Sequence, residues 1–97
     1  MDKYIIDLNK FRQMKLLGKG FFREVCLIED KSTNEKYAAK ILYQQLIKKQ
    51  NQVSFFNEIQ ALISAKNPAF PAFLGFNIYT FNKDPYPTII MFHKTFH

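Results

Sequence analysis

The chain has 97 residues, of which 47% are hydrophobic and 23% charged, and its formal net charge is +6. This length leaves too little apolar surface for a second core, and the composition is close to that of folded proteins, so we exclude a multidomain or largely disordered chain. The positive charge gives a general attraction to phosphates, but the lysines are scattered along the sequence and mark no nucleic-acid site.

The number of cysteines, the spacing of the histidines and the length of the apolar runs limit which cofactors the protein can bind and where in the cell we expect it. Cys26 is the only cysteine, so an internal disulfide and a cysteine metal cage are both excluded. The two histidines have no ligand spacing, and we expect no metal site. No apolar stretch approaches the roughly 20 residues that span a bilayer, and residues 1–4 lack a signal-peptide profile. We therefore expect a cytoplasmic protein without a membrane partner.

The first predicted element is a β-hairpin with a glycine loop. Residues 11–17 alternate loosely between apolar and polar side chains, which indicates a strand. Gly18 and Gly20 then supply a turn at positions where β-carbons would be awkward. Residues 25–28 form a second β-prone run, which ends in the polar, turn-favouring residues 30–34.

A third strand is predicted at residues 36–43. Because side chains alternate between the two faces of a strand, Ala38, Lys40 and Leu42 share one face. Lys40 is therefore expected to share its face of the strand with a small alanine.

The next element is an amphipathic helix at residues 54–65. Five apolar side chains recur there at helical spacing, namely Phe55, Phe56, Ile59, Leu62 and Ile63. Glu58 lies at the margin of this apolar stripe and can turn inward. Asn67 and Pro68 are expected to end the helix, since proline cannot continue it.

Two further β-prone stretches, at 73–81 and 88–92, are separated by the turn residues 82–85. The predicted fold class is thus α+β, with a five-stranded antiparallel sheet and one packed helix. We assign residues 1–10 to an N-terminal extension and residues 11–97 to the domain.

The glycine loop, Lys40 and Glu58 form a candidate phosphate site. Glycines let a covering loop approach nucleotide phosphates closely, a lysine on the third strand supplies a fixed cation, and a helix carboxylate can direct that ammonium group. Gly18 and Gly20 alone are weak evidence, because such pairs also occur in ordinary hairpins. The combination in this order and on these elements is much harder to obtain by chance.

On these motifs, residues 11–92 resemble the small N-terminal lobe of a eukaryotic protein kinase. The run at 86–90, with residues 9–11 ahead of the first strand, is similar to tyrosine-kinase-like members. The resemblance implies ATP as the bound nucleotide and, for the family, phosphoryl transfer from ATP to protein Ser, Thr or Tyr.

The resemblance also implies a set of ATP-binding residues. Gly18 and Gly20 would cover the phosphates, which Lys40 would bind with Glu58 as its partner. The remaining positions would surround the base and close the loop: Leu17 and Val25 as the roof of the adenine pocket, Ala38 as the space beneath it, Met91 as the gatekeeper, and Phe22 as the aromatic residue at the loop tip.

Two departures from the family pattern affect the expected function. Arg23 replaces the third glycine, which restricts the loop but offers a guanidinium as another phosphate contact. The sequence contains neither a His-Arg-Asp catalytic loop nor the Asp-Phe-Gly motif that holds Mg²⁺ in a complete kinase. We therefore expect a kinase domain truncated before its catalytic loop, without catalytic residues or metal ligands and inactive as an isolated chain.

Two other functions stay open at this point. An N-lobe without its second lobe would expose an apolar cleft face, so the chain can be a non-catalytic docking or decoy module that binds a kinase or scaffold. A small basic β-domain that binds nucleic acid is the weaker alternative, because aromatic residues at stacking spacing are not evident.

Overall fold

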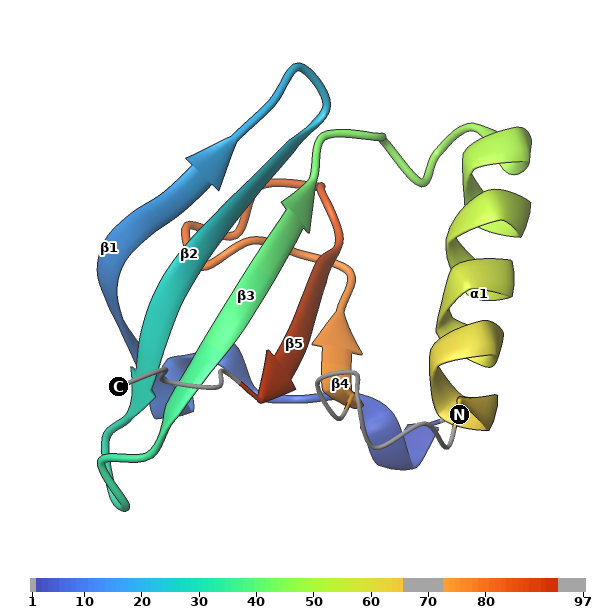
Figure 1. The fold of residues 1–97 in the computed structure, drawn as a ribbon. Helices are drawn as coiled ribbons and strands as arrows, with labels where there is room; N and C mark the ends of the chain where they lie inside the picture. Colours follow the sequence, from blue (N-terminus) through green and yellow to red (C-terminus); the bar gives the residue numbers. More distant parts are fainter. Residues whose placement is uncertain (1, 66–72, 93–97) are drawn as a thin grey trace.

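A five-stranded antiparallel sheet forms the centre of the molecule in a computed structural model that describes residues 2–65 and 73–92 (Figure 1). The strands lie in the order β1-β2-β3-β5-β4, and helix α1 stands beside the β4 side of the sheet. The predicted α+β class, with five antiparallel strands and one helix, is confirmed.

The described residues form two short helical turns, five strands and one helix. In chain order these elements are the 3-10 turns η1 (Asp2–Tyr4) and η2 (Leu8–Lys10), then β1 (Phe11–Lys19), β2 (Arg23–Asp30), β3 (Lys36–Leu42), α1 (Lys49–Ser64), β4 (Phe73–Asn77) and β5 (Thr88–Phe92). The bounds of β3 and β5 agree with the sequence to within one residue.

Helix α1 begins at Lys49, five residues before the predicted start, so that boundary was wrong. The first turn is polar and has no apolar periodicity, but side-chain amides bond it to the preceding loop. Asn51 Nδ2 donates to the Gln45 carbonyl at 2.9 Å, and Gln52 Nε2 donates to the Leu46 carbonyl at 2.6 Å. The helix ends at Ser64, and the predicted stop at residues 67–68 lies outside the described residues.

Strand β4 ends at Asn77 instead of residue 81, because a compact loop replaces the ladder. The Thr80 hydroxyl oxygen accepts hydrogen bonds from the backbone N–H groups of Asn82 and Asp84, at 3.2 and 3.0 Å. The Thr88 hydroxyl donates to the Tyr79 carbonyl at 2.9 Å. These side-chain bonds satisfy the backbone without a partner strand.

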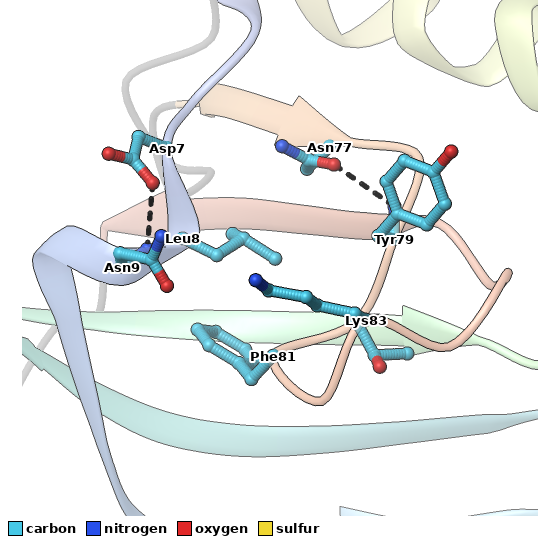
Figure 2. A pocket seen from close by; sticks show the side chains of 8 residues that line it. Asp7, Leu8, Asn9, Asn77, Tyr79, Phe81 and Lys83 are labelled. Atoms are coloured by element: carbon cyan, nitrogen blue, oxygen red, sulfur yellow. Dashed lines mark hydrogen bonds between the residues drawn. The ribbon is translucent and has the colours of Figure 1, made fainter.

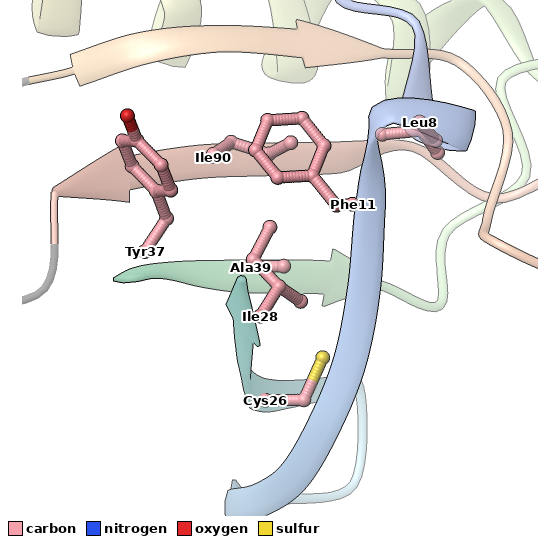
Figure 3. Packing of buried hydrophobic residues seen from close by; sticks show 7 residues of the cluster. All are labelled: Leu8, Phe11, Cys26, Ile28, Tyr37, Ala39 and Ile90. Carbon is pink, nitrogen blue, oxygen red and sulfur yellow. The ribbon is translucent and has the colours of Figure 1, made fainter. Parts of the chain in front are cut away.

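One face of the sheet, here called the closed face, carries an apolar core (Figure 3). Strand alternation sends Cys26, Ile28, Tyr37, Ala39 and Ile90 to this face. Leu8 and Phe11, from the chain that leads into β1, pack against them and complete the cluster.

The opposite face, here called the helix face, carries a second core between α1 and the β4–β5 side of the sheet. Phe55 and Ile59 of the helix are buried there against Phe76 and Ile89. The aromatic pair Phe55–Phe76 is edge-on, with ring centroids 5.7 Å apart. The helix is therefore held against the sheet at the level of Glu58, one residue before Ile59.

The N-terminal segment, residues 2–10, passes along the edge strand β4 at residues 4–6. The Ile6 N–H donates to the Phe76 carbonyl at 2.9 Å, and the Asn77 side-chain amide donates to the Ile6 carbonyl at 2.7 Å. A β-carbon on Gly75 would overlap the Tyr4 carbonyl oxygen and the Ile6 side chain. Glycine is required at position 75 for this approach, and the division of the chain after residue 10 stays a prediction.

Candidate nucleotide site

The β1–β2 hairpin forms the cover of the candidate site. Gly18 pairs with Val25 inside the ladder, and the Gly20 N–H donates to the Arg23 carbonyl at 2.8 Å. Phe21 and Phe22, 97% and 68% exposed, make the tip.

Of the two glycines that the sequence assigned to the turn, Gly20 lies in it, between β1 and β2, whereas Gly18 lies within β1, and neither has a positive φ angle. A β-carbon on Gly18 would meet no protein atom within 4 Å. The fold itself therefore gives no steric reason for glycine at position 18. Because Gly18 has no side chain, the space beneath the hairpin stays open at this position.

Lys40 and Glu58 face one another across the gap between β3 and α1. Lys40 stands on the helix face, in register with Val25 and Ile89. Its Nζ lies 3.9 Å from Glu58 Oε1, and the two side chains are 21% and 40% exposed. This distance is that of an ion pair without a hydrogen bond, and a partly exposed pair of this kind contributes little to stability.

The second carboxylate oxygen of Glu58 is buried. Within the described residues Oε2 has no hydrogen-bond partner. A buried acceptor without a donor costs free energy, and in native proteins it usually marks a functional constraint or a group that binds there.

Two adjoining hollows of about 460 and 410 Å³ lie beneath the hairpin. Gly20, Arg23 and Lys40 line both of them. The larger hollow also touches Phe21, Phe22, Leu42, Gln44, Ser54, Phe55 and Glu58, and the smaller one Gly18, Lys19 and Val25. The hairpin, β3 and α1 thus border a region of two hollows that share three lining residues and have Lys19, Arg23 and Lys40 in their walls.

The structure brings six of the nine predicted site residues to this region: Gly18, Gly20, Phe22, Val25, Lys40 and Glu58. Ala38 and Met91 are paired across β3 and β5, on the same face as Lys40 but outside the two hollows. Leu17 is 40% exposed at an irregularity in the β1–β2 ladder and likewise does not line them.

Seven residues that line the hollows were not among the nine predicted site residues, although Arg23 had been noted as a further phosphate contact: Lys19, Phe21, Arg23, Leu42, Gln44, Ser54 and Phe55. Arg23 and Ser54 had a detectable signal. Arg23 is two residues before Val25 on one strand, and Ser54 is four residues before Glu58 on one helix, so each shares a face with a predicted site residue. Gln44 follows β3 in a loop and had no such signal.

A separate hollow of about 360 Å³ lies between η2 and the β4–β5 loop, where Leu8 and Phe81 also contact the closed-face core (Figure 2). The Lys83 ammonium group extends toward Leu8 and Asn9. The lining contains one cation and no glycine, so its chemistry differs from that of the region beneath the hairpin.

Tyr43, beside the hairpin tip, and Cys26, on the opposite face of the sheet, are both held in their neutral forms. Burial raises the pKa of the Tyr43 hydroxyl, and its hydrogen bond to Glu24 Oε1, 3.0 Å long, raises that pKa further. Burial also raises the pKa of the Cys26 thiol on the closed face, which makes this cysteine a packing residue rather than a nucleophile.

A glycine hairpin over a strand lysine that faces a helix glutamate defines the N-terminal lobe of protein kinases as a class. RAC-beta serine/threonine-protein kinase A of Xenopus laevis is 37% identical to this chain over 68 residues, and the human RAC-beta serine/threonine-protein kinase is 35% identical over 68. Each match covers 69% of this chain. No protein-family model matches. On fold and similarity together, the chain belongs to the protein kinase family as an N-lobe.

The match spans only 14% of the length of each of these relatives. Their names describe serine/threonine kinases, and the tyrosine-kinase-like grouping stays a prediction.

No helix in the described parts of the chain has the length and apolarity to cross a membrane.

Proposed function

We propose that this chain binds ATP beneath the β1–β2 hairpin, as part of a protein kinase that transfers phosphate from ATP to Ser, Thr or Tyr of proteins. The observation that carries the proposal is the Lys40–Glu58 pair, 3.9 Å apart at the wall of the two hollows. In a kinase lobe the lysine binds the phosphates and the glutamate directs it. Kinase relatives support the same nucleotide.

The residues present fit a nucleotide triphosphate. The open space over Gly18 leaves room for phosphates to approach the hairpin backbone, and the Lys40 ammonium stands below. The buried Glu58 oxygen without a donor suits a carboxylate that takes up the lysine ammonium more closely once a ligand orders the site.

The base would extend from these phosphates along the helix face of the sheet. Leu17 and Val25 would cover it, Ala38 would leave space beneath it, and Met91 would close the back of the pocket. Val25 borders the phosphate region directly, and Ala38 and Met91 are paired two residues along β3 from Lys40. Phe22 would shield the phosphates from the tip of the hairpin.

We propose that the 97 residues alone are catalytically inactive. Their sequence has no His-Arg-Asp or Asp-Phe-Gly motif, and in residues 2–65 and 73–92 no cluster of three metal-ligating side chains forms. Mg²⁺ would be supplied with the nucleotide in a complete kinase, and no residue described in this chain is assigned to it. We propose a cytoplasmic location.

Calorimetric titration with ATP tests the proposal. Wild type should bind ATP, and Lys40→Ala should bind it at least about tenfold more weakly, because a charge-assisted phosphate contact is lost. Lys36→Ala is the matched control, since Lys36 lies on the same strand but pairs with Glu29 at 3.1 Å, away from the hollows. Equal ATP affinity in wild type and Lys40→Ala would reject the site.

A docking function has separate support from the tip of the hairpin. Phe21 and Phe22 expose 97% and 68% of their surfaces, which is unusual for adjacent large aromatic residues. A protein that covers the cleft face would bury both rings. A one-to-one complex with a kinase or scaffold that Phe21→Ser abolishes, with ATP binding absent from wild type, would favour this function over nucleotide binding.

A further inference from the structure

Arg23 occupies the position at which the kinase glycine loop has its third glycine. It is the first residue of β2 and pairs with Leu42 of β3. Because alternate residues of a strand share a face, Arg23 stands on the same face as Val25, and Val25 is in register with Lys40. The substitution therefore adds a cation to the face that carries the phosphate-binding lysine.

The first carbons of the Arg23 side chain lie close to Gly20, across the turn of the hairpin. A β-carbon on Gly20 would lie 3.9 Å from Arg23 Cγ and 3.8 Å from the Arg23 carbonyl oxygen. The backbone at Arg23 is free of positive φ, so the larger residue introduces no backbone strain at this point. Arg23 also borders both hollows, as Lys40 does, and the two cations flank the same region from the hairpin and from β3.

The guanidinium group of Arg23 has no carboxylate to neutralise it within residues 2–65 and 73–92. The salt bridges there involve Arg12, Lys36 and Lys40. The acidic neighbour Glu24 alternates to the other face of β2, where its carboxylate accepts the Tyr43 hydroxyl. The charge of Arg23 is thus available to an anion in the hollows.

We propose that Arg23 is a second phosphate-binding residue, whose guanidinium binds the terminal phosphates from the hairpin side while Lys40 binds them from β3. This inference rests on the proposed ATP site. A guanidinium presents a planar fork of donors that matches two phosphate oxygens at once, which a backbone N–H at glycine cannot do. Three cations line the two hollows, Lys19, Arg23 and Lys40, against the single carboxylate of Glu58, so affinity should rise with the number of phosphates on the nucleotide.

Calorimetric titrations of the 97-residue chain with ATP, ADP, AMP and adenosine, each without added metal, test this assignment. Arg23→Ala should lower ATP affinity about tenfold and leave adenosine affinity unchanged, because only the phosphate contact is lost. Arg23→Lys should keep part of the ATP affinity through its charge. Arg12→Ala, which removes a guanidinium paired with Glu29 at 3.3 Å, should bind all four ligands as wild type does.

The outcomes separate this inference from the ATP site itself. If Arg23→Ala and Arg23→Gly bind ATP as tightly as wild type while Lys40→Ala does not, the role of Arg23 is overturned and the ATP site stands. An equal loss for ATP and adenosine in Arg23→Ala assigns the residue to hairpin structure and also overturns the role. Absence of ATP binding by folded wild type, checked by circular dichroism, overturns both.

Discussion

The two faces of the sheet are built from the same strands but differ in what covers them. On the closed face, Ile28, Ala39 and Ile90 are fully buried, and the N-terminal segment seals the core. On the helix face, α1 packs against Phe76 and Ile89 near β4 and β5, while the region beneath the β1–β2 hairpin stays open. Both faces therefore contribute a buried core, but only the helix face also keeps polar groups accessible.

The change from one face to the other occurs between consecutive residues. Ala39 has no exposed surface, whereas the next side chain, that of Lys40, is 21% exposed at the candidate site. A strand places a binding residue and a core residue side by side in sequence without making them neighbours in space. Substitutions can therefore separate stability from ligand binding along a single strand.

Ile89 and Ile90 give the largest expected effects and the sharpest test of this separation. Both are fully buried, Ile90 on the closed face and Ile89 against α1. Alanine at either position should lower the free energy of unfolding by about 2–5 kcal/mol, measured by urea titration. Only Ile89→Ala should also weaken ATP binding by the folded protein, because it loosens the helix that holds Glu58.

If the alanine variants do not fold, the milder substitutions Ile90→Val and Ile89→Val replace them in the test. Each should cost about 0.5–1.5 kcal/mol, so ATP affinity can be compared on folded protein. Equal losses of ATP affinity in the two valine variants would contradict the division between the faces.

Gly75→Ala should have the next largest effect, on the N-terminal segment. The added methyl group would displace the chain at Tyr4 and Ile6, and overpacking of this kind costs about 1–3 kcal/mol of stability. Hydrogen exchange should show faster exchange of the Ile6 N–H, whose hydrogen bond to Phe76 would be lost. Unchanged protection of that N–H would show that the segment is not held by the approach to β4.

Asp30, the last residue of β2 before the turn to β3, should give the smallest effect. Hydrogen bonds from the Ser32 backbone N–H and hydroxyl, at 2.8 and 2.9 Å, lower the pKa of its carboxyl group. A carboxyl whose pKa is lower in the folded state stabilises the fold above its unfolded pKa, and this contribution is lost as pH falls through the folded pKa.

Asp30→Asn should therefore lower the melting temperature at neutral pH, and the difference from wild type should vanish in strong acid. Glu35→Gln in the same turn is the control, since within the described residues its carboxylate accepts no hydrogen bond. A difference between Asp30→Asn and wild type that persists unchanged in strong acid would reject the assigned hydrogen bonds.

Local patterns predicted most of the sheet and the central pair of the site. Alternation along β3 correctly separated Ala38 and Lys40 from Tyr37 and Ala39, because strand periodicity depends only on neighbouring residues. Helical spacing put Glu58 at the margin of the buried stripe, where it meets Lys40.

Features that depend on distant residues were not predictable. The N-terminal segment has no periodicity of its own, and its place beside β4 depends on the missing side chain at Gly75. The early start of α1 depends on amide bonds from Asn51 and Gln52 to a loop. The open space at Gly18 exists only once the hairpin has formed and cannot be read from neighbouring residues. The sequence alone therefore assigned that glycine to a turn.

A nuclear magnetic resonance titration of the isotope-labelled chain with ATP tests the central claim most directly. We expect backbone amide shifts in the hairpin, at Lys40 and at Glu58, with little change at Ile28 and Ile90 on the closed face. Shifts concentrated instead around Asn9 and Lys83, which line the separate hollow, or no shifts at all, would contradict it.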